Sequence, residues 1–151
     1  MKLHWIALPF SQLSLKQLYD LLKLRMEVFV VEQNCPYQDN DGKDEKSYHL
    51  LGINPEGLVL AYARILPAGL AFREVSIGRV CTSASVRKNG SGKELMRQAL
   101  LFIKNTYGGV PVRIGAQLYL KRFYSGLGFS AEGEEYLEDN IPHVEMVFTS
   151  Q

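Results

Sequence analysis

The chain has 151 residues, of which 46% are hydrophobic and 22% are charged, and its formal net charge is +1. This length fits one domain, 1–151, that can bury roughly 68–70% of the surface of the unfolded chain, and the composition excludes a disordered or low-complexity protein. The near-neutral charge argues against nucleic acid as a partner, and no apolar run is long enough to span a membrane. The N-terminus lacks the apolar stretch of a signal peptide, so we expect a cytoplasmic protein.

The first half of the chain alternates between strand and helix patterns. The predicted elements are a strand at 3–7, a helix at 15–30, a loop at 32–46, and strands at 48–53 and 58–66. Ser14 and Gln17 have the spacing of a capping box, which marks the start of the helix. The segment Asn54-Pro55-Glu56-Gly57 is a hairpin signal, so we expect the two strands beside it to pair antiparallel.

The second half has a different order of elements. The predicted elements are a strand at 74–82, a helix from about 93 to 107, a strand at 110–116, a helix at 118–125, and strands at 129–136 and 144–149. A meander, then a strand–helix–strand crossover, then a closing hairpin indicate an α+β protein. We therefore expect a mixed, mostly antiparallel sheet of six to seven strands flanked by helices.

The segment from Arg87 to Gly92 lies between a strand and a helix. Gly90 and Gly92 have no Cβ and are expected to take positive φ, which turns successive backbone N–H groups toward one point. The helix start that follows adds free donors and a partial positive charge. This pattern predicts a phosphate site, although a simple turn is the common alternative for such a loop.

The cysteines and histidines do not follow the spacing of a metal site. Cys35 and Cys81 form no CxxC or Cys/His motif, so free buried thiols are expected, and no metal. Cys81 lies within a predicted strand without an obvious histidine partner, which favours a small core residue over a covalent nucleophile. His4, His49 and His143 are scattered along the chain.

Two motifs together resemble those of a known family. Arg87-x-x-Gly90-x-Gly92 follows a strand, and the later segment 117–129 contains Phe123-Tyr124-x-x-x-Gly128-Phe129. With the order of elements, this pair resembles the GNAT superfamily of acetyl-CoA-dependent N-acetyltransferases over the whole chain. The segments 24–33, 77–80 and 141–143 are similar to those of its ElaA-like subgroup.

The resemblance implies a GNAT fold with a splayed central strand pair, and transfer of acetyl from acetyl-CoA to a primary amine by direct attack. The exposed backbone of the splayed strand pairs with the pantetheine arm in that family, and the loop binds the pyrophosphate. The residues that it assigns to the cofactor here are Val80, Cys81, Thr82, Arg87, Lys88, Asn89, Gly90, Ser91, Gly92, Lys93, Gln117, Phe123 and Tyr124.

The resemblance also implies the catalytic groups. Tyr124 matches the tyrosine that many GNAT enzymes place near the sulfur, where a phenol can protonate the departing thiolate. The position at which several relatives carry a glutamate base is Ser76 here. Glu74 lies two residues earlier on the same strand face and is a candidate base. His143 and His49 are the other candidates, and a structural role is the alternative for each histidine.

The acceptor groove of GNAT folds lies beneath the segment that follows the first helix. By resemblance, the candidate acceptor-binding residues are Arg25, Glu32, Gln33, His49 and His143. Glu32 would attract a cationic amine and Arg25 would hold a carboxylate, whereas an internal ion pair is the alternative for Arg25. Acetyl-CoA and a small-molecule or peptide amine are the expected ligands, and a homodimer is compatible with the sequence.

Two other function classes remain open. The first is a non-catalytic module that binds or senses acyl-CoA. The second is an enzyme like the acyl-homoserine lactone synthases, whose early Arg-x-x-Val-Phe pattern is similar to residues 25–29.

Overall fold

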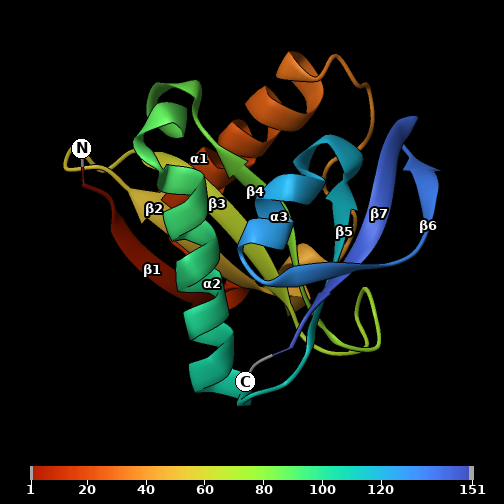
Figure 1. Cartoon of the computed structure of the whole chain (residues 1–151). Coiled ribbons are helices and arrows are strands. Elements are labelled where there is room, and N and C mark those ends of the chain that lie inside the picture. The colour runs from red at the N-terminus through yellow and green to blue at the C-terminus, as the bar shows by residue number, and fades with distance from the viewer. Residues whose placement is uncertain (1, 150–151) are drawn as a thin grey trace.

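The structure, a computed structural model, describes residues 2–149. Seven strands form one sheet in the order β1-β2-β3-β4-β5-β7-β6 (Figure 1). The strands and main helices are β1 (His4–Pro9), α1 (Leu15–Arg25), β2 (Tyr48–Ile53), β3 (Val59–Leu66), β4 (Val75–Thr82), α2 (Ser91–Tyr107), β5 (Val112–Gln117), α3 (Lys121–Gly126), β6 (Phe129–Glu138) and β7 (Ile141–Phe148). The α+β class and the mixed sheet are therefore as predicted.

The first helix starts and ends for identifiable reasons. Ser14 Oγ accepts a hydrogen bond from the Gln17 amide at 3.0 Å, and Gln17 Oε1 accepts one from the Ser14 amide at 2.8 Å, which confirms the capping box. Beyond Arg25 the chain does not continue as an α-helix to Val30, because Met26–Glu32 is π-helical. π-helical turns are rare and frequently occur at functional sites.

The hairpin between β2 and β3 is also built as predicted. Gly57 has φ +86° and donates its amide to the Asn54 carbonyl at 2.9 Å. The Asn54 side chain accepts a further hydrogen bond from the Leu58 amide at 2.8 Å. The strands that flank this turn pair antiparallel.

Helices cover both faces of the sheet. Leu21 and Leu24 of α1 form one buried cluster with Tyr62 of β3. Met96 and Ala99 of α2 belong to a second cluster, which includes the alternate β3 residues Ala61, Ala63 and Ile65. Side chains of a strand point to opposite faces in turn, so α1 and α2 lie on opposite sides of β3 (Figure 1).

The central strands β4 and β5 separate soon after they meet. They pair in parallel only at Val75 with Val112 and at Ser76 with Arg113. From Ile77 onward the two strands diverge (Figure 1), which confirms the predicted splayed pair. A β-bulge lies in this part of β4, where Arg79 has φ +51° and the register with β3 shifts. Bulges bend a strand and redirect its side chains, often beside active sites.

The last hairpin is longer than the sequence pattern indicated. Asp139 and Asn140 have φ +51° and +64°, the left-handed pair of a two-residue type I′ turn. β7 therefore begins at Ile141 rather than at Val144, and His143 lies inside the strand.

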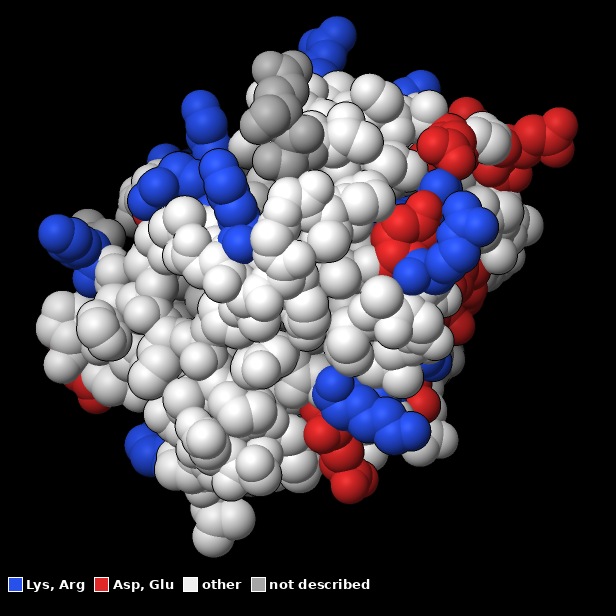
Figure 2. Space-filling view, turned by 90° about the horizontal axis from the view of Figure 1, so that it is seen from below, with Lys and Arg blue, Asp and Glu red and all other residues white. Residues whose placement is uncertain are grey.

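The surface seen from below has a broad uncharged area, and basic and acidic groups alternate along its right side (Figure 2). Within residues 2–149, no helix has both the length and the apolar character needed to cross a membrane.

Candidate active site

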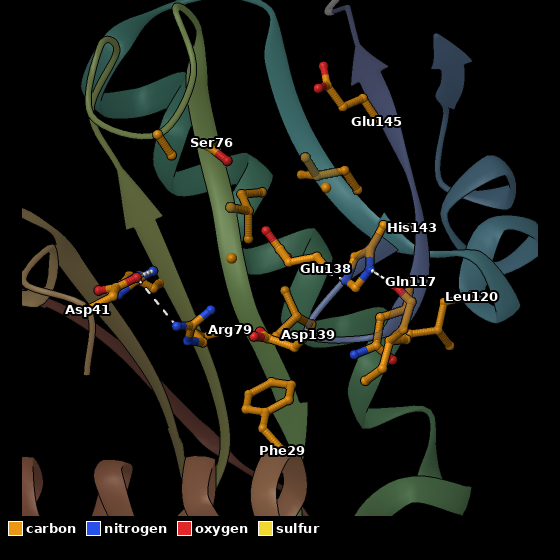
Figure 3. A pocket seen from close by; sticks show the side chains of 18 of the residues that line it. Phe29, Asp41, Ser76, Arg79, Gln117, Leu120, Glu138, Asp139, His143 and Glu145 are labelled. Carbon is orange, nitrogen blue, oxygen red and sulfur yellow. Dashed lines mark hydrogen bonds and ion pairs between the residues drawn. The ribbon is translucent and has the colours of Figure 1, made fainter. Parts of the chain in front are cut away.

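The divergence of β4 and β5 opens a cavity with a volume of about 440 Å³. Its wall combines segments that are far apart in the sequence, as Figure 3 shows. The π-helical segment contributes Phe29, β4 contributes Arg79, and the strands on the other side contribute Gln117 and His143. A cavity between splayed strands gives access to backbone groups that a continuous sheet would use for pairing.

Tyr124 reaches this cavity from α3. Tyr124 is only 6% exposed. Its ring contacts the rings of Phe123 and Phe129 edge to face, at centroid distances of 5.2 and 5.9 Å. Burial raises the pKa of the Tyr124 phenol, so the group stays protonated at neutral pH. The residue is therefore a proton donor held in place by aromatic packing.

His143 reaches the same cavity from β7. Its Nδ1 lies 2.6 Å from the carbonyl oxygen of Ile141, an acceptor, so Nδ1 carries the proton in the neutral ring. Nε2 then has a free lone pair, and its nearest acidic neighbour is Glu138 Oε2 at 3.6 Å. The imidazole therefore has the tautomer that a general base needs.

The loop before α2 has part of the backbone geometry that we expected for a phosphate site. Gly90 has φ +74° and precedes the helix without a side-chain cap, and the first intrahelical bond runs from the Glu94 amide to the Gly90 carbonyl. The amides of residues 91–93 precede this bond and are available to an anion. Gly92, however, lies within α2 and has no positive φ, so the expectation that it turns the backbone is wrong.

Gly92 has a packing role instead. A Cβ built on it would lie 3.8 Å from Phe123 Cζ, an ordinary contact distance. Phe123 therefore lies beside the start of α2 and joins that helix to α3. Lys88, Asn89 and Lys93 are exposed around the loop, whereas Ser91 is buried.

Arg87 and Glu32 bind each other, which changes the interpretation of both. Arg87 Nη2 lies 2.6 Å from Glu32 Oε1, and the same guanidinium donates to the Thr82 carbonyl at 2.8 Å. The hydrogen bond from Arg87 lowers the pKa of Glu32. Glu32 thus lies beside the end of β4 and the loop before α2, and its position does not support a role in binding the acceptor.

The side chains of β4 beyond the point where it leaves β5 point to different faces of the sheet. Val80 lines the cavity, whereas Cys81 packs with the cluster beneath α1. Burial raises the pKa of the Cys81 thiol, so a thiolate nucleophile is disfavoured there. Thr82 is half-buried and supplies the carbonyl that Arg87 binds.

Gln33 and Gln117 meet across the cavity. Their side-chain amides lie 3.2 Å apart, measured from Gln33 Nε2 to Gln117 Oε1, and both residues line the wall. The segment after α1 is thereby joined to the end of β5. Leu120, from the turn that precedes α3, lies near Gln117 in Figure 3 and narrows this part of the cavity.

Arg25 and His49 belong to the interior, not to the acceptor groove. Arg25 is fully buried, and its guanidinium binds Asp39 and Asp44 at 2.8 Å each. His49 is also fully buried, with Nδ1 at 2.7 Å from the Tyr62 hydroxyl and Nε2 at 2.8 Å from the Asp44 carbonyl. Neither residue lines the cavity, so the internal ion pair is the correct interpretation of Arg25.

The same buried network fixes the segment from 39 to 44 beside the cavity. Arg64 binds Asp41 and Asp44, and Arg79 donates to the Asp39 carbonyl at 2.9 Å. Burial alone would raise the pKa of Asp44, but Arg25 and Arg64 outweigh this effect and lower it. The contacts between these cations and carboxylates therefore stabilise the segment at pH values above those at which aspartate titrates.

We expect Arg25→Met to lower the free energy of unfolding by about 3–5 kcal/mol, because it leaves buried carboxylates without their cation. An unfolded aspartate titrates near pH 4, so the parent keeps this stabilisation above about pH 4 and loses it as the pH falls through the folded-state pKa. The variant should depend less on pH in that range. Urea unfolding across pH measures both effects.

Arg97→Met is the matched control, since Arg97 pairs with Glu94 on the exposed surface of α2 with a side chain that is 61% exposed. Exposed ion pairs contribute little to stability. Equal losses in the two variants would show that the buried network is not the source of the effect.

Glu74 lies outside the cavity wall. Its carboxylate is 3.0 Å from Arg113 Nη2, and this hydrogen bond lowers the pKa of Glu74. A carboxylate that is held by a guanidinium and does not line the cavity is a poor base, so its position does not support the role that we expected from the sequence. Ser76 does line the cavity, but a hydroxyl is not basic.

Sequence reasoning missed several residues of the cavity wall. Tyr136, Gly115 and Glu138 line it beside His143, and Cys35 Sγ lies 3.4 Å from the Asp139 carbonyl across its edge. Asp139-Asn140 is a recognisable signal for a two-residue hairpin, and it would have placed Tyr136 opposite His143. The sequence contains no local signal for Gly115.

Comparisons with known proteins agree with this architecture. The family model described as the acetyltransferase (GNAT) domain matches residues 17–150. Protein ElaA of Escherichia coli K12 is 46% identical over 146 residues, which cover 95% of each chain. The crystal structure of E. coli ElaA has a TM-score of 0.89 and 43% identity, and covers 97% of this chain and 99% of that chain.

A further solved structure, described as an acyl-CoA N-acyltransferase from Pseudomonas aeruginosa, has a TM-score of 0.92 at 43% identity. The match covers 98% of this chain and 100% of that chain. The family model, the identity over nearly the full length and the splayed β4–β5 pair agree with one another. The chain belongs to the GNAT family of acetyltransferases.

Proposed function

We propose that this protein is an N-acetyltransferase that transfers acetyl from acetyl-CoA to the primary amine of an acceptor by direct attack. The observation that carries the proposal is that Tyr124 and His143, a proton donor and a proton acceptor, line one cavity at the opening between β4 and β5. They come from α3 and β7, two elements on the β5 side of that opening. An acid and a base that reach one cavity are what an acyl transfer requires.

The chain offers a suitable site for coenzyme A. The amides of residues 91–93 point from the start of the 17-residue helix α2, which suits a pyrophosphate. Backbone groups of β4 beyond Ser76 have no partner on β5 and suit the amides of the pantetheine arm. When bound, acetyl-CoA supplies the acetyl group as an activated thioester.

The two side chains divide the proton transfers between them. His143 Nε2 takes a proton from the amine as its nitrogen forms the new bond to the acetyl carbon. Tyr124 Oη gives a proton to the sulfur as the carbon–sulfur bond breaks. The products are an N-acetyl amine and coenzyme A, after which His143 releases its proton to water and Tyr124 takes one back.

A panel of amines tests the proposal by thiol release from acetyl-CoA. Amine-dependent release, with the acetylated amine identified by mass spectrometry, is the expected result. Tight binding of coenzyme A without turnover of any amine would favour the acyl-CoA-binding module. Consumption of S-adenosylmethionine with acyl-CoA would instead favour the lactone synthase class.

We expect Gly90→Val to weaken coenzyme A binding by roughly ten- to a hundredfold, the loss of one or two hydrogen bonds to a charged group. Gly90 has φ +74° with open space around its Cα, so the cause is backbone conformation and not a steric clash. Calorimetric titration measures the affinity.

Gly57→Val is the control for this prediction. Gly57 also has a positive φ, +86°, and open space, but it lies in the β2–β3 turn. Gly57→Val should lower the free energy of unfolding and leave the affinity for coenzyme A unchanged. Equal affinity in the parent and Gly90→Val would remove the loop from the phosphate site.

A further inference from the structure

The side chain of Tyr136 extends across the neighbouring strand β7, on the face of the sheet that lines the cavity. It pairs in register with His143 of β7, and Gly115 of β5 pairs with Glu145 of the same strand. Residues paired across antiparallel strands point to the same face, and so do residues two apart on one strand. Tyr136, His143, Glu145 and Gly115 therefore share one face, and the phenol extends from β6 over β7 toward β5.

The end of that phenol occupies the space that a side chain at Gly115 would fill. A Cβ built on Gly115 would lie 2.7 Å from Tyr136 Oη, closer than real contacts allow, and the next atom, Phe72 Cζ, is at 3.8 Å. Gly115 does not have a positive φ. A side chain at position 115 would therefore have to displace the Tyr136 hydroxyl, whereas the backbone conformation itself does not call for glycine.

The ring of Tyr136 lies on the imidazole of His143. The two centroids are 5.7 Å apart and the planes are inclined by 25°, a stacked arrangement. The hydrogen bond from Nδ1 to the Ile141 carbonyl fixes one edge of the imidazole, and the stacked phenol fixes its plane. These two contacts together determine where Nε2 points.

We propose that Tyr136 is a positioning residue for His143, and that the bare backbone at Gly115 gives its ring room to lie there. The inference rests on the proposed function, in which His143 is the base. It assigns to Tyr136 the task of holding Nε2 toward the amine. A displacement of about 1 Å at a reacting group can cost about a hundredfold in rate.

Few charged groups face the imidazole. From β6 it faces Tyr136 and Glu138, whose Oε2 is 3.6 Å from Nε2. From β5 its cross-strand neighbour is Gln117, which is uncharged. Glu145, two residues along β7, is held by Arg113 at 2.9 Å. Glu138 is 60% exposed, so it does not fix the imidazole, and the stacked ring is the constraint from this strand.

The test uses the fact that Tyr136→Phe removes the one atom with which an alanine at Gly115 would clash. We expect Gly115→Ala to push the ring aside and lower kcat by about ten- to a hundredfold, with KM for acetyl-CoA unchanged. Tyr136→Phe alone keeps the ring on His143 and is the reference for the double variant. The double variant Gly115→Ala/Tyr136→Phe should regain the rate of Tyr136→Phe.

A second variant, Tyr136→Ala, deletes the stacked ring without touching β5 and should lower kcat in the same way. Circular dichroism and calorimetric titration of coenzyme A establish that each variant is folded and binds its cosubstrate. The inference is overturned if Gly115→Ala or Tyr136→Ala keeps the parental kcat. It is also overturned if the double variant stays as slow as Gly115→Ala, which would indicate strain in β5.

The outcome is separate from that of the proposed function. If the parent acetylates no amine, the proposed function fails before any variant is compared. If the parent is active and only the pattern of rescue is absent, the role of Tyr136 fails while the acetyltransferase assignment stands.

Discussion

Tyr124→Phe should lower kcat by roughly 10²–10⁴ while the affinity for coenzyme A persists, the range typical of a lost general acid or base. The substitution removes only the hydroxyl, and the ring keeps its edge-to-face contacts with Phe123 and Phe129. Because burial raises the pKa of Tyr124, the parent phenol carries its proton throughout the neutral range. Steady-state kinetics at saturating acetyl-CoA and amine measure the loss.

Tyr107→Phe is the matched control for this prediction. Tyr107 is the last residue of α2, burial raises its pKa as well, and it does not line the cavity. It should leave kcat unchanged, which would show that a raised phenol pKa is not sufficient for the effect. If Tyr124→Phe is as fast as the parent, the leaving sulfur receives its proton from another source.

Short-range signals predicted most of the fold. The capping box at Ser14, the Asn54–Gly57 turn and the positive φ of Gly90 all depend on residues within about one turn of each other. Such features follow from local sterics and hydrogen bonding. The splayed pair was expected only by resemblance to the family, because no residue pattern within β4 or β5 indicates where two parallel strands diverge.

The partners of charged residues could not be predicted in the same way. Arg25 binds Asp39, Glu32 binds Arg87, and Glu74 binds Arg113, across sequence separations of 14, 55 and 39 residues. Each of these side chains is chemically suited to bind a substrate or act in catalysis. Only the tertiary structure shows that each of these side chains is already bound to another side chain of the protein.

The contact between Tyr136 and Gly115 was missed for a further reason. Both residues lie in strands whose patterns look ordinary, and their proximity depends on the register of β5, β7 and β6 together. A glycine inside a strand sometimes marks the close approach of another group. The sequence alone does not say which group that is.

His143→Asn tests the base and should lower kcat/KM by roughly 10²–10⁴. Asparagine keeps an N–H near the position of Nδ1 and so can still donate to the Ile141 carbonyl, but it has no basic nitrogen in place of Nε2. Steady-state kinetics at saturating acetyl-CoA, with the amine concentration varied, measure the loss.

His4→Asn is the control, since His4 is exposed on β1 and distant in the sheet order from β7. It should keep the kcat/KM of the parent. A loss in both variants would show that the effect is not specific to the histidine in the cavity. If His143→Asn also keeps the parental kcat/KM, the amine loses its proton by another route and His143 is not the base, because asparagine offers no basic nitrogen at the position of Nε2.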